Sequence, residues 1–168
     1  MVTKAINPVL EKSSYGFNKH QTFHFREVWL HKGLTALEKD GKGLAKGMHH
    51  SLGVGANMLD AIKYWMQATN LATLDPEIKK APRPLVLTDL GKLILEEDPY
   101  FEDALTLWLI HVELASNKEL ATLWYLLFNE YGNRDFNKER SSIFIQDVLE
   151  VSGHRDQVTD KAIESDFA

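Results

Sequence analysis

The stretch that decides the fold runs from residue 52 to residue 70 and reads LGVGANMLDAIKYWMQATN. Gly53 and Gly55 favour a tight turn, because glycine adopts positive φ without a steric penalty. Beyond them, apolar side chains recur at helical spacing and predict a helix over residues 56–70. Residues 44–51 predict a short helix before the turn. Two helices joined at a steep angle by a glycine turn are typical of the helix-turn-helix motif.

The next segment predicts a β-hairpin. Residues 71–75 and 85–87 favour strands, and residues 76–84 contain three prolines and predict a basic loop. Thr88 is suited to cap a helix that continues to Leu95. We therefore expect a mainly α fold with a winged helix-turn-helix-like domain over residues 16–97, in which the basic loop is the wing.

The remainder of the chain is predicted to be helical. Further helices are expected at residues 26–39, 102–115, 118–131, 138–151 and from 158 onward. The helix over 102–115 is expected to bury Leu105, Trp108, Leu109 and Val112, and Trp65, Trp124 and Phe128 are expected in the core.

Three parts of the chain follow from this pattern. We expect a loosely ordered N-terminus over 1–15, the winged helix-like domain, and a helical domain over 98–168 that is incomplete at its C-terminus. The last three helices fit either a second, truncated helix-turn-helix or a plain helical bundle. The final helix lacks a capping Gly or Asn, so we expect an N-terminal fragment of a longer protein.

Composition excludes several classes of protein. The 168 residues are 44% hydrophobic and include no cysteine, which excludes a disulfide scaffold, a thiolate metal site and a cysteine nucleophile. No apolar run approaches the roughly 18 residues that span a bilayer, and no secretory signal is present, so a cytoplasmic protein without membrane contact is predicted. No motif indicates catalysis, a cofactor or a metal, and an enzyme is the less favoured interpretation.

Charge is distributed unevenly along the chain. The net charge is −5, yet residues 1–50 hold eight basic and four acidic groups, whereas residues 101–150 hold four basic and nine acidic groups. The first part suits phosphate, and the second suits a protein partner or plain solvation.

The winged-helix interpretation assigns DNA contacts to ten side chains. On the second helix, Asn57, Lys63, Tyr64 and Gln67 would face the major groove, where Asn and Gln can pair with adenine. Phosphate contacts would come from Lys46, His49 and His50 before that helix and from Lys79, Lys80 and Arg83 in the wing. Asp60 lies on the same helix face and opposes phosphate binding.

A polar cluster near the N-terminus contains His20, Thr22 and Arg26. It is either a ligand or anion site, or a structural set that ties the N-terminal segment to the core. Phe23 and Phe25 alternate with its polar residues and favour an extended segment, which argues against a metal held by His20 and His24.

Several motifs together resemble the bacterial and archaeal DUF4007 family, a domain of unknown function. The resemblance covers about residues 15–131 and rests on GFNKHQTFHFR (16–26), WLHKG (29–33), LGVGANM (52–58), YW (64–65), DPYFED (98–103), TLWLIH (106–111) and TLWYLLFN (122–129). Family members favour a basic residue after LGVG, where this chain has Ala56.

The resemblance implies an association with DNA sulfur modification, phage defence and phosphoadenosine-phosphosulfate-reductase-like proteins. We therefore expect a non-enzymatic DNA-binding or regulatory accessory protein, with double-stranded DNA or such a protein as partner. The alternative is a protein-interaction adaptor that uses its acidic helices and does not touch nucleic acid. An enzyme or ligand sensor centred on His20 and Arg26 is the third hypothesis.

Overall fold

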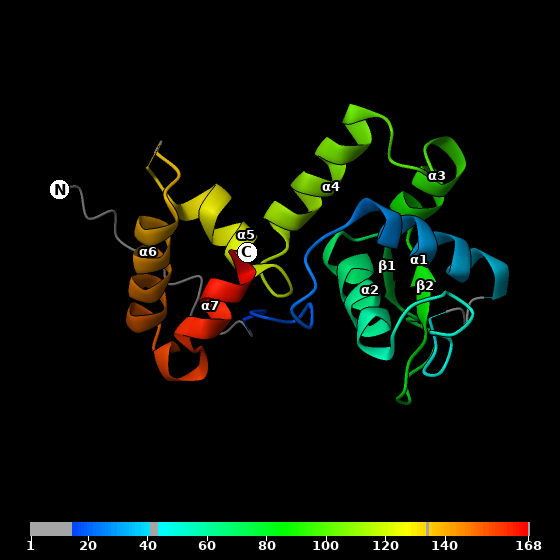
Figure 1. Cartoon of the computed structure of the whole chain (residues 1–168), viewed down its shortest axis with the longest axis horizontal. Helices are drawn as coiled ribbons and strands as arrows, with labels where there is room; N and C mark the ends of the chain where they lie inside the picture. Colours follow the sequence, from blue (N-terminus) through cyan, green and yellow to red (C-terminus); the bar gives the residue numbers. More distant parts are fainter. Residues whose placement is uncertain (1–14, 41–43, 134, 168) are drawn as a thin grey trace. The chain divides into compact units, whose positions relative to one another are not determined.

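The computed structural model describes residues 15–40, 44–133 and 135–167, which are mainly helical with one two-stranded antiparallel sheet (Figure 1). Two compact units are present. We call residues 19–114 the hairpin unit, and the described residues up to Asn18 together with those from Ala115 onward the C-terminal unit. The predicted mainly α class is confirmed.

The hairpin unit is built on two packed helices, α1 (Glu27–Asp40) and α2 (Ala56–Ala68). Both helices bury one apolar face, formed by Leu30, Leu34, Leu59, Ile62 and Met66. The helices approach closely at Gly33, where an added Cβ would lie 2.5 Å from the Met66 sulfur. Both helices start and end within two residues of the predicted limits, because each carries a regular apolar stripe.

The hairpin follows α2 directly. Strands β1 (Ala72–Leu74) and β2 (Leu85–Leu87) pair antiparallel, with Thr73 opposite Val86. Helix α3 (Asp89–Glu97) begins at the predicted cap, where the Thr88 hydroxyl accepts the Gly91 N–H at 3.0 Å. The same hydroxyl donates to the Asn70 carbonyl at 2.6 Å and so ties both ends of the hairpin together.

Residues 44–54, hereafter the turn segment, form successive turns and no helix. Their hydrogen bonds have mixed spacing: Met48 N–H donates to Ala45 O, whereas Val54 N–H donates to His49 O. Gly47 has a φ of 96° and interrupts any right-handed helix at this position. The predicted short helix over 44–51 is therefore wrong, and the winged helix-turn-helix is not confirmed.

Helix α4 (Ala104–Ser116) exposes the face that the sequence analysis expected to be buried. Leu105, Trp108, Leu109 and Val112 are exposed, whereas Thr106, Ile110 and Leu114 are buried. The helix is apolar on nearly all sides, so periodicity alone does not identify the buried stripe. The prediction for this face is wrong. Phe128 is also exposed, while Trp65 lies in the core as expected and Trp124 is half-buried.

The C-terminal unit packs short helices around one core. Its elements are α5 (Thr122–Tyr125), a π-helical segment (Leu126–Glu130), α6 (Lys138–Val151), a 3-10 turn (Arg155–Gln157) and α7 (Asp160–Asp166). The core contains Phe17 together with Leu126, Ile145, Leu149 and Ile163. Gly16 N–H donates to the Thr122 hydroxyl at 2.8 Å, which fixes the incoming chain to this unit.

The unit boundaries differ from the expected limits at residues 16 and 98. Residues 16–18 belong to the C-terminal unit, and residues 98–114 belong to the hairpin unit. The second assignment has a clear cause, because Phe101 is buried and the His31 ring nitrogen Nδ1 lies 2.7 Å from the Pro99 carbonyl oxygen. Residues 1–14 of the N-terminus predicted to be loosely ordered lie outside the described residues. Within the described part of the chain, no helix is both long and apolar enough to cross a bilayer.

Replacing Gly91 by Ala should destabilise the protein. Its added Cβ would collide with the backbone carbonyl of Leu71, which cannot move without displacing the hairpin. We expect the free energy of unfolding to fall by about 3 kcal/mol, as for other overpacked sites. Urea denaturation followed by circular dichroism measures this change. Gly132→Ala is the matched control, because nothing lies within 4 Å of an added Cβ there; equal stability of the two variants would contradict the prediction.

Candidate nucleic-acid interface

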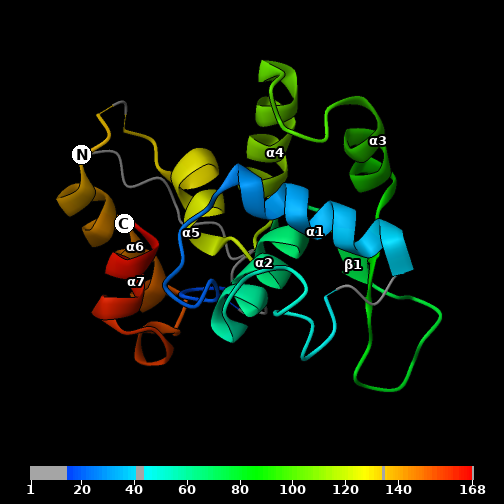
Figure 2. The same ribbon diagram turned by 45° about the vertical axis from the view of Figure 1, so that its right-hand side comes forward.

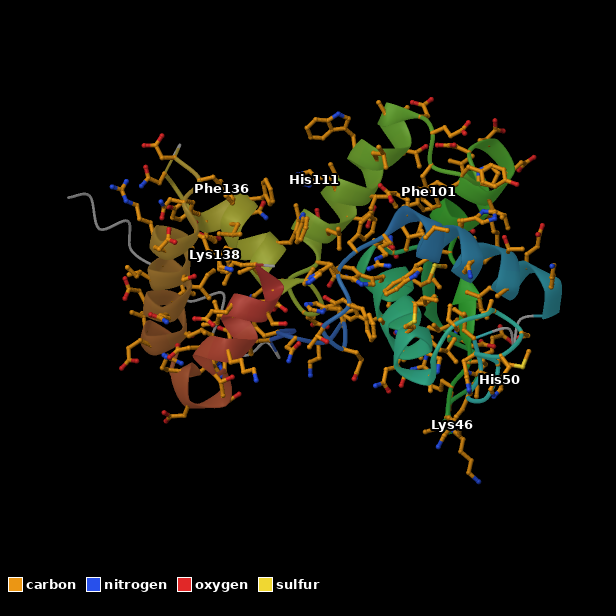
Figure 3. All side chains as sticks on the ribbon, in the orientation of Figure 1. Lys46, His50, Phe101, His111, Phe136 and Lys138 are labelled. Atoms are coloured by element: carbon orange, nitrogen blue, oxygen red, sulfur yellow. The ribbon has the colours of Figure 1, made fainter. Side chains whose placement is uncertain are left out.

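Exposed basic side chains from two segments gather at one end of the hairpin unit. The turn segment and the loop between the strands (residues 75–84, the hairpin loop) both extend to the lower end of this unit in Figures 1 and 2. Lys46 and His50 are exposed on the turn segment, and Lys79 and Lys80 are exposed on the hairpin loop. Figure 3 shows Lys46 pointing outward from this end. We call the surface formed by these four residues the basic end.

The hairpin loop is held in shape by Arg83. Its Nε donates to the Asp75 carbonyl at 3.1 Å, and its Nη2 donates to the carbonyls of Asp75 and Leu74 at 2.9 and 3.2 Å. The Asp75 N–H closes the base of the loop on Pro84 O at 2.9 Å. Arg83, predicted to contact phosphate, thus has a structural role that presents Lys79 and Lys80 to solvent.

The turn segment is anchored on α1. Lys32 Nζ donates to the Leu52 carbonyl at 2.9 Å, and the Ser51 hydroxyl donates to the Met48 carbonyl at 2.7 Å. The rings of His49 and His50 lie 4.0 Å apart. A pocket of about 380 Å³ separates α1 from this segment, and basic or polar groups line much of it: His31, Lys32, Thr35, Lys39 and Ser51.

Most of the predicted reading face of α2 is engaged within the unit. Lys63 Nζ pairs with Asp60 Oδ1 at 3.1 Å, and Gln67 Nε2 donates to the Lys63 carbonyl at 3.0 Å. Tyr64 is half-buried, with its ring 4.9 Å from that of Trp65. Asn57 is exposed near the start of α2. Base reading along the whole helix is therefore poorly supported by these side chains.

The N-terminus of α2 adds partial positive charge near the basic end. Gly55 occupies the capping position without a side-chain hydrogen bond, and the first turn contains no acidic residue. The first backbone N–H groups of a helix have no intrahelical partner, and the helix dipole is positive there. Together with the lysines, this arrangement suits the phosphate backbone of a nucleic acid. Asp60 and Glu77 reduce the positive field locally.

The predicted cluster of His20, Thr22 and Arg26 does not form one polar site. His20 is buried and stacks on Trp65 with ring centroids 5.7 Å apart, whereas Thr22 and Arg26 are exposed. The Arg26 guanidinium lies 5.2 Å from the centre of the Trp29 ring. Phe23 and Phe25 alternate in burial with His24 and Arg26, as expected for an extended segment. The arrangement supports the structural interpretation, in which His20 packs the N-terminal segment on α2.

Metal ligands are not grouped in the part of the chain that the structure describes. Over residues 15–40, 44–133 and 135–167, no three His, Asp or Glu side chains come together in a way that could hold an ion. The carboxylates of Asp98, Glu102 and Asp103 belong to the connection between α3 and α4, where Asp98 accepts the backbone N–H groups of the other two at 2.9 and 3.0 Å.

Comparison with known proteins identifies the family. The chain belongs to DUF4007, a family of proteins of unknown function whose model matches residues 17–168, and the predicted resemblance is confirmed. No curated protein sequence gives a significant match. Two solved structures are similar at 26% identity: a magnesium ion-bound SspB crystal structure with a TM-score of 0.79 and an SspB crystal structure with a TM-score of 0.77. Each match covers 94% of this chain and 49% of the other, so this chain spans about half the length of SspB.

Loss of the Arg83 guanidinium should loosen the hairpin loop. In Arg83→Ala, we expect the backbone amides of residues 75–84 to exchange about tenfold faster, which corresponds to about 1.4 kcal/mol of local stability. Hydrogen exchange read by mass spectrometry tests this effect. Lys79→Ala in the same loop is the control and should exchange like the wild type; equally fast exchange in both variants would show that Arg83 does not hold the loop.

Proposed function

We propose that this DUF4007 protein is a non-enzymatic DNA-binding or regulatory accessory protein of a DNA-modification system, and that its basic end contacts the DNA backbone. The observation that carries the proposal is the gathering of Lys46, His50, Lys79 and Lys80 from two separate segments at one end of the hairpin unit. We interpret this unit as winged helix-like, with the hairpin loop as the wing and the turn segment in place of the predicted short helix.

The geometry favours contact with phosphate over reading of bases. Lysines at the tip of a loop can reach phosphate oxygens, which position a protein on DNA without specifying sequence. Two of the side chains that could have read bases from α2 are engaged, since Lys63 pairs with Asp60 and Gln67 bonds to the helix backbone. We therefore propose binding with little sequence preference, and any selectivity would come from partner proteins.

The biological setting of the proposal comes from the family. The resemblance links DUF4007 with DNA sulfur modification, with phage defence and with phosphoadenosine-phosphosulfate-reductase-like proteins. We propose a protein of this last class as the partner. The likeness to SspB supports a comparison of function with that protein over the half that this chain matches. One SspB structure contains a magnesium ion, but the described residues of this chain assemble no group of metal ligands, and the proposal includes no metal step.

Binding to duplex DNA should weaken steeply with salt. With three phosphate contacts from the lysines of the basic end, the affinity should fall about fortyfold between 50 and 200 mM salt, because released counterions drive the association. Fluorescence anisotropy with a labelled 25-base-pair duplex measures this dependence. Lys79→Glu combined with Lys80→Glu should weaken binding at least tenfold at the lower salt concentration and reduce the logarithmic salt slope by about 2.

The matched control for this experiment is Lys138→Glu, which reverses an exposed lysine at the start of α6 in the other unit (Figure 3). It should bind DNA like the wild type. Absence of binding by the folded wild-type protein, or an equal loss in Lys138→Glu, would refute the proposed contact.

The face of α2 provides a separate test of how DNA is recognised. If the phosphate backbone is the main contact, Gln67→Ala and Lys63→Ala should change the affinity by less than about threefold, because both side chains form hydrogen bonds within α2. The dissociation constants measured with two duplexes of unrelated sequence should agree within about twofold. A loss of tenfold or more in Gln67→Ala that depends on the duplex sequence would instead establish α2 as a recognition helix.

A further inference from the structure

Helix α4 carries two apolar stripes, and only one of them is covered. Thr106, Ile110 and Leu114 are buried. The opposite stripe follows helical spacing through Leu105, Trp108, Leu109 and Val112, which are 65, 65, 38 and 54% exposed. An exposed apolar stripe of this kind on a helix marks a surface that another chain can cover.

Part of this stripe forms a groove with α3. The groove, which we call the α3–α4 groove, has a volume of about 700 Å³. Its apolar lining consists of Leu93, Ile94, Leu105 and Leu109, and Leu93 is 53% exposed. Its rim carries four carboxylates and no Lys or Arg: Glu97, Asp98, Glu102 and Asp103.

The acidic rim is fixed by the local backbone. Asp98 accepts hydrogen bonds from the N–H groups of Glu102 and Asp103, and the Asp103 carboxylate accepts the Leu105 N–H at 2.8 Å. Burial acts to raise the pKa of Asp98, but the hydrogen bonds from the Glu102 backbone, the Thr106 side chain and the Asp103 backbone outweigh it and lower this pKa below its usual value. The Asp98 carboxylate therefore stays ionised at neutral pH and is held in place at the rim.

We propose that the α3–α4 groove binds a basic amphipathic helix of a partner protein. Apolar side chains of that helix would pack on Leu93, Leu105 and Leu109, and flanking Lys or Arg would face the carboxylates of the rim. This is the helix-in-groove mode of recognition, in which apolar anchors recur every three or four residues.

The negative charge of the rim indicates which kind of partner the α3–α4 groove would bind. A second copy of this chain placed symmetrically on the groove would bring eight rim carboxylates together, and like charges at an interface oppose association. A basic helix removes this repulsion and covers the apolar lining at the same time. The proposal takes up the adaptor hypothesis and is independent of DNA contact, because the groove and the basic end share no residue.

The probe for this groove is a labelled 18-residue amphipathic peptide with leucine on one face and lysine on the other. We expect it to bind the full chain, as measured by fluorescence anisotropy at 50 mM salt. A peptide with the same leucine face and glutamate in place of lysine should bind at least tenfold more weakly. A scrambled leucine–lysine peptide, which has the same composition without an apolar face, should also bind at least tenfold more weakly.

Variants of the protein locate the binding site. Leu105→Asp combined with Leu109→Asp should weaken peptide binding at least tenfold, and Glu97→Lys combined with Glu102→Lys should have a similar effect. Val151→Asp is the matched control, because Val151 is 66% exposed on α6 and lies outside the groove. All variants are compared at equal helix content by circular dichroism. DNA binding should be unchanged by Leu105→Asp, so the outcomes of the two proposals are distinguishable.

The proposal is overturned by equal binding of the lysine and glutamate peptides, by an equal loss in Val151→Asp, or by no binding to the wild type. Sedimentation equilibrium of the chain alone tests whether a second copy of the chain binds at the α3–α4 groove. A dimer that Leu105→Asp converts to a monomer would assign the groove to self-association and refute the basic partner.

Discussion

The close approach of Gly91 to the carbonyl of Leu71 is the constraint on which the hairpin unit depends. The absence of a Cβ lets the first turn of α3 sit directly on the start of the hairpin. Leu71 O also accepts the Thr88 N–H at 3.1 Å, while the Thr88 hydroxyl bridges Asn70 and Gly91. Because these contacts fix both ends of the hairpin, its loop projects in one direction, and Arg83 then sets the shape of that loop.

The hairpin unit has two chemically distinct surfaces. The hairpin loop and the turn segment carry exposed lysines at one end, whereas α3 and the first part of α4 lie away from that end in both ribbon views. The groove between α3 and α4 is apolar with an acidic rim. The proposed phosphate surface and the proposed docking groove share no residue, so the two proposals do not exclude one another.

Local signals predicted the elements well wherever they were unambiguous. The stripe of α2, the two short strands and the Thr88 cap each have a strong local signature, and all were confirmed. The short helix over 44–51 failed because Gly47 takes a φ of 96°, which the apolar pattern does not reveal. Among the candidate DNA contacts, the lysines of the loop were predicted from charge alone, and the structure shows only that they are exposed. The engagement of Lys63 with Asp60 and of Arg83 with the loop backbone required coordinates.

The sequence by itself determined the family, the mainly helical class, the hairpin and the uneven charge, because these depend on residue type and on spacing over a few residues. The tertiary structure alone decided which stripe of α4 is buried. Both stripes of that helix are apolar, and only the folded structure shows that Ile110 and Leu114 are buried while Leu105 and Trp108 are exposed. It also decided the grouping of residues 98–114 with α1, since the contact of His31 with Pro99 joins positions that are 68 residues apart in the chain.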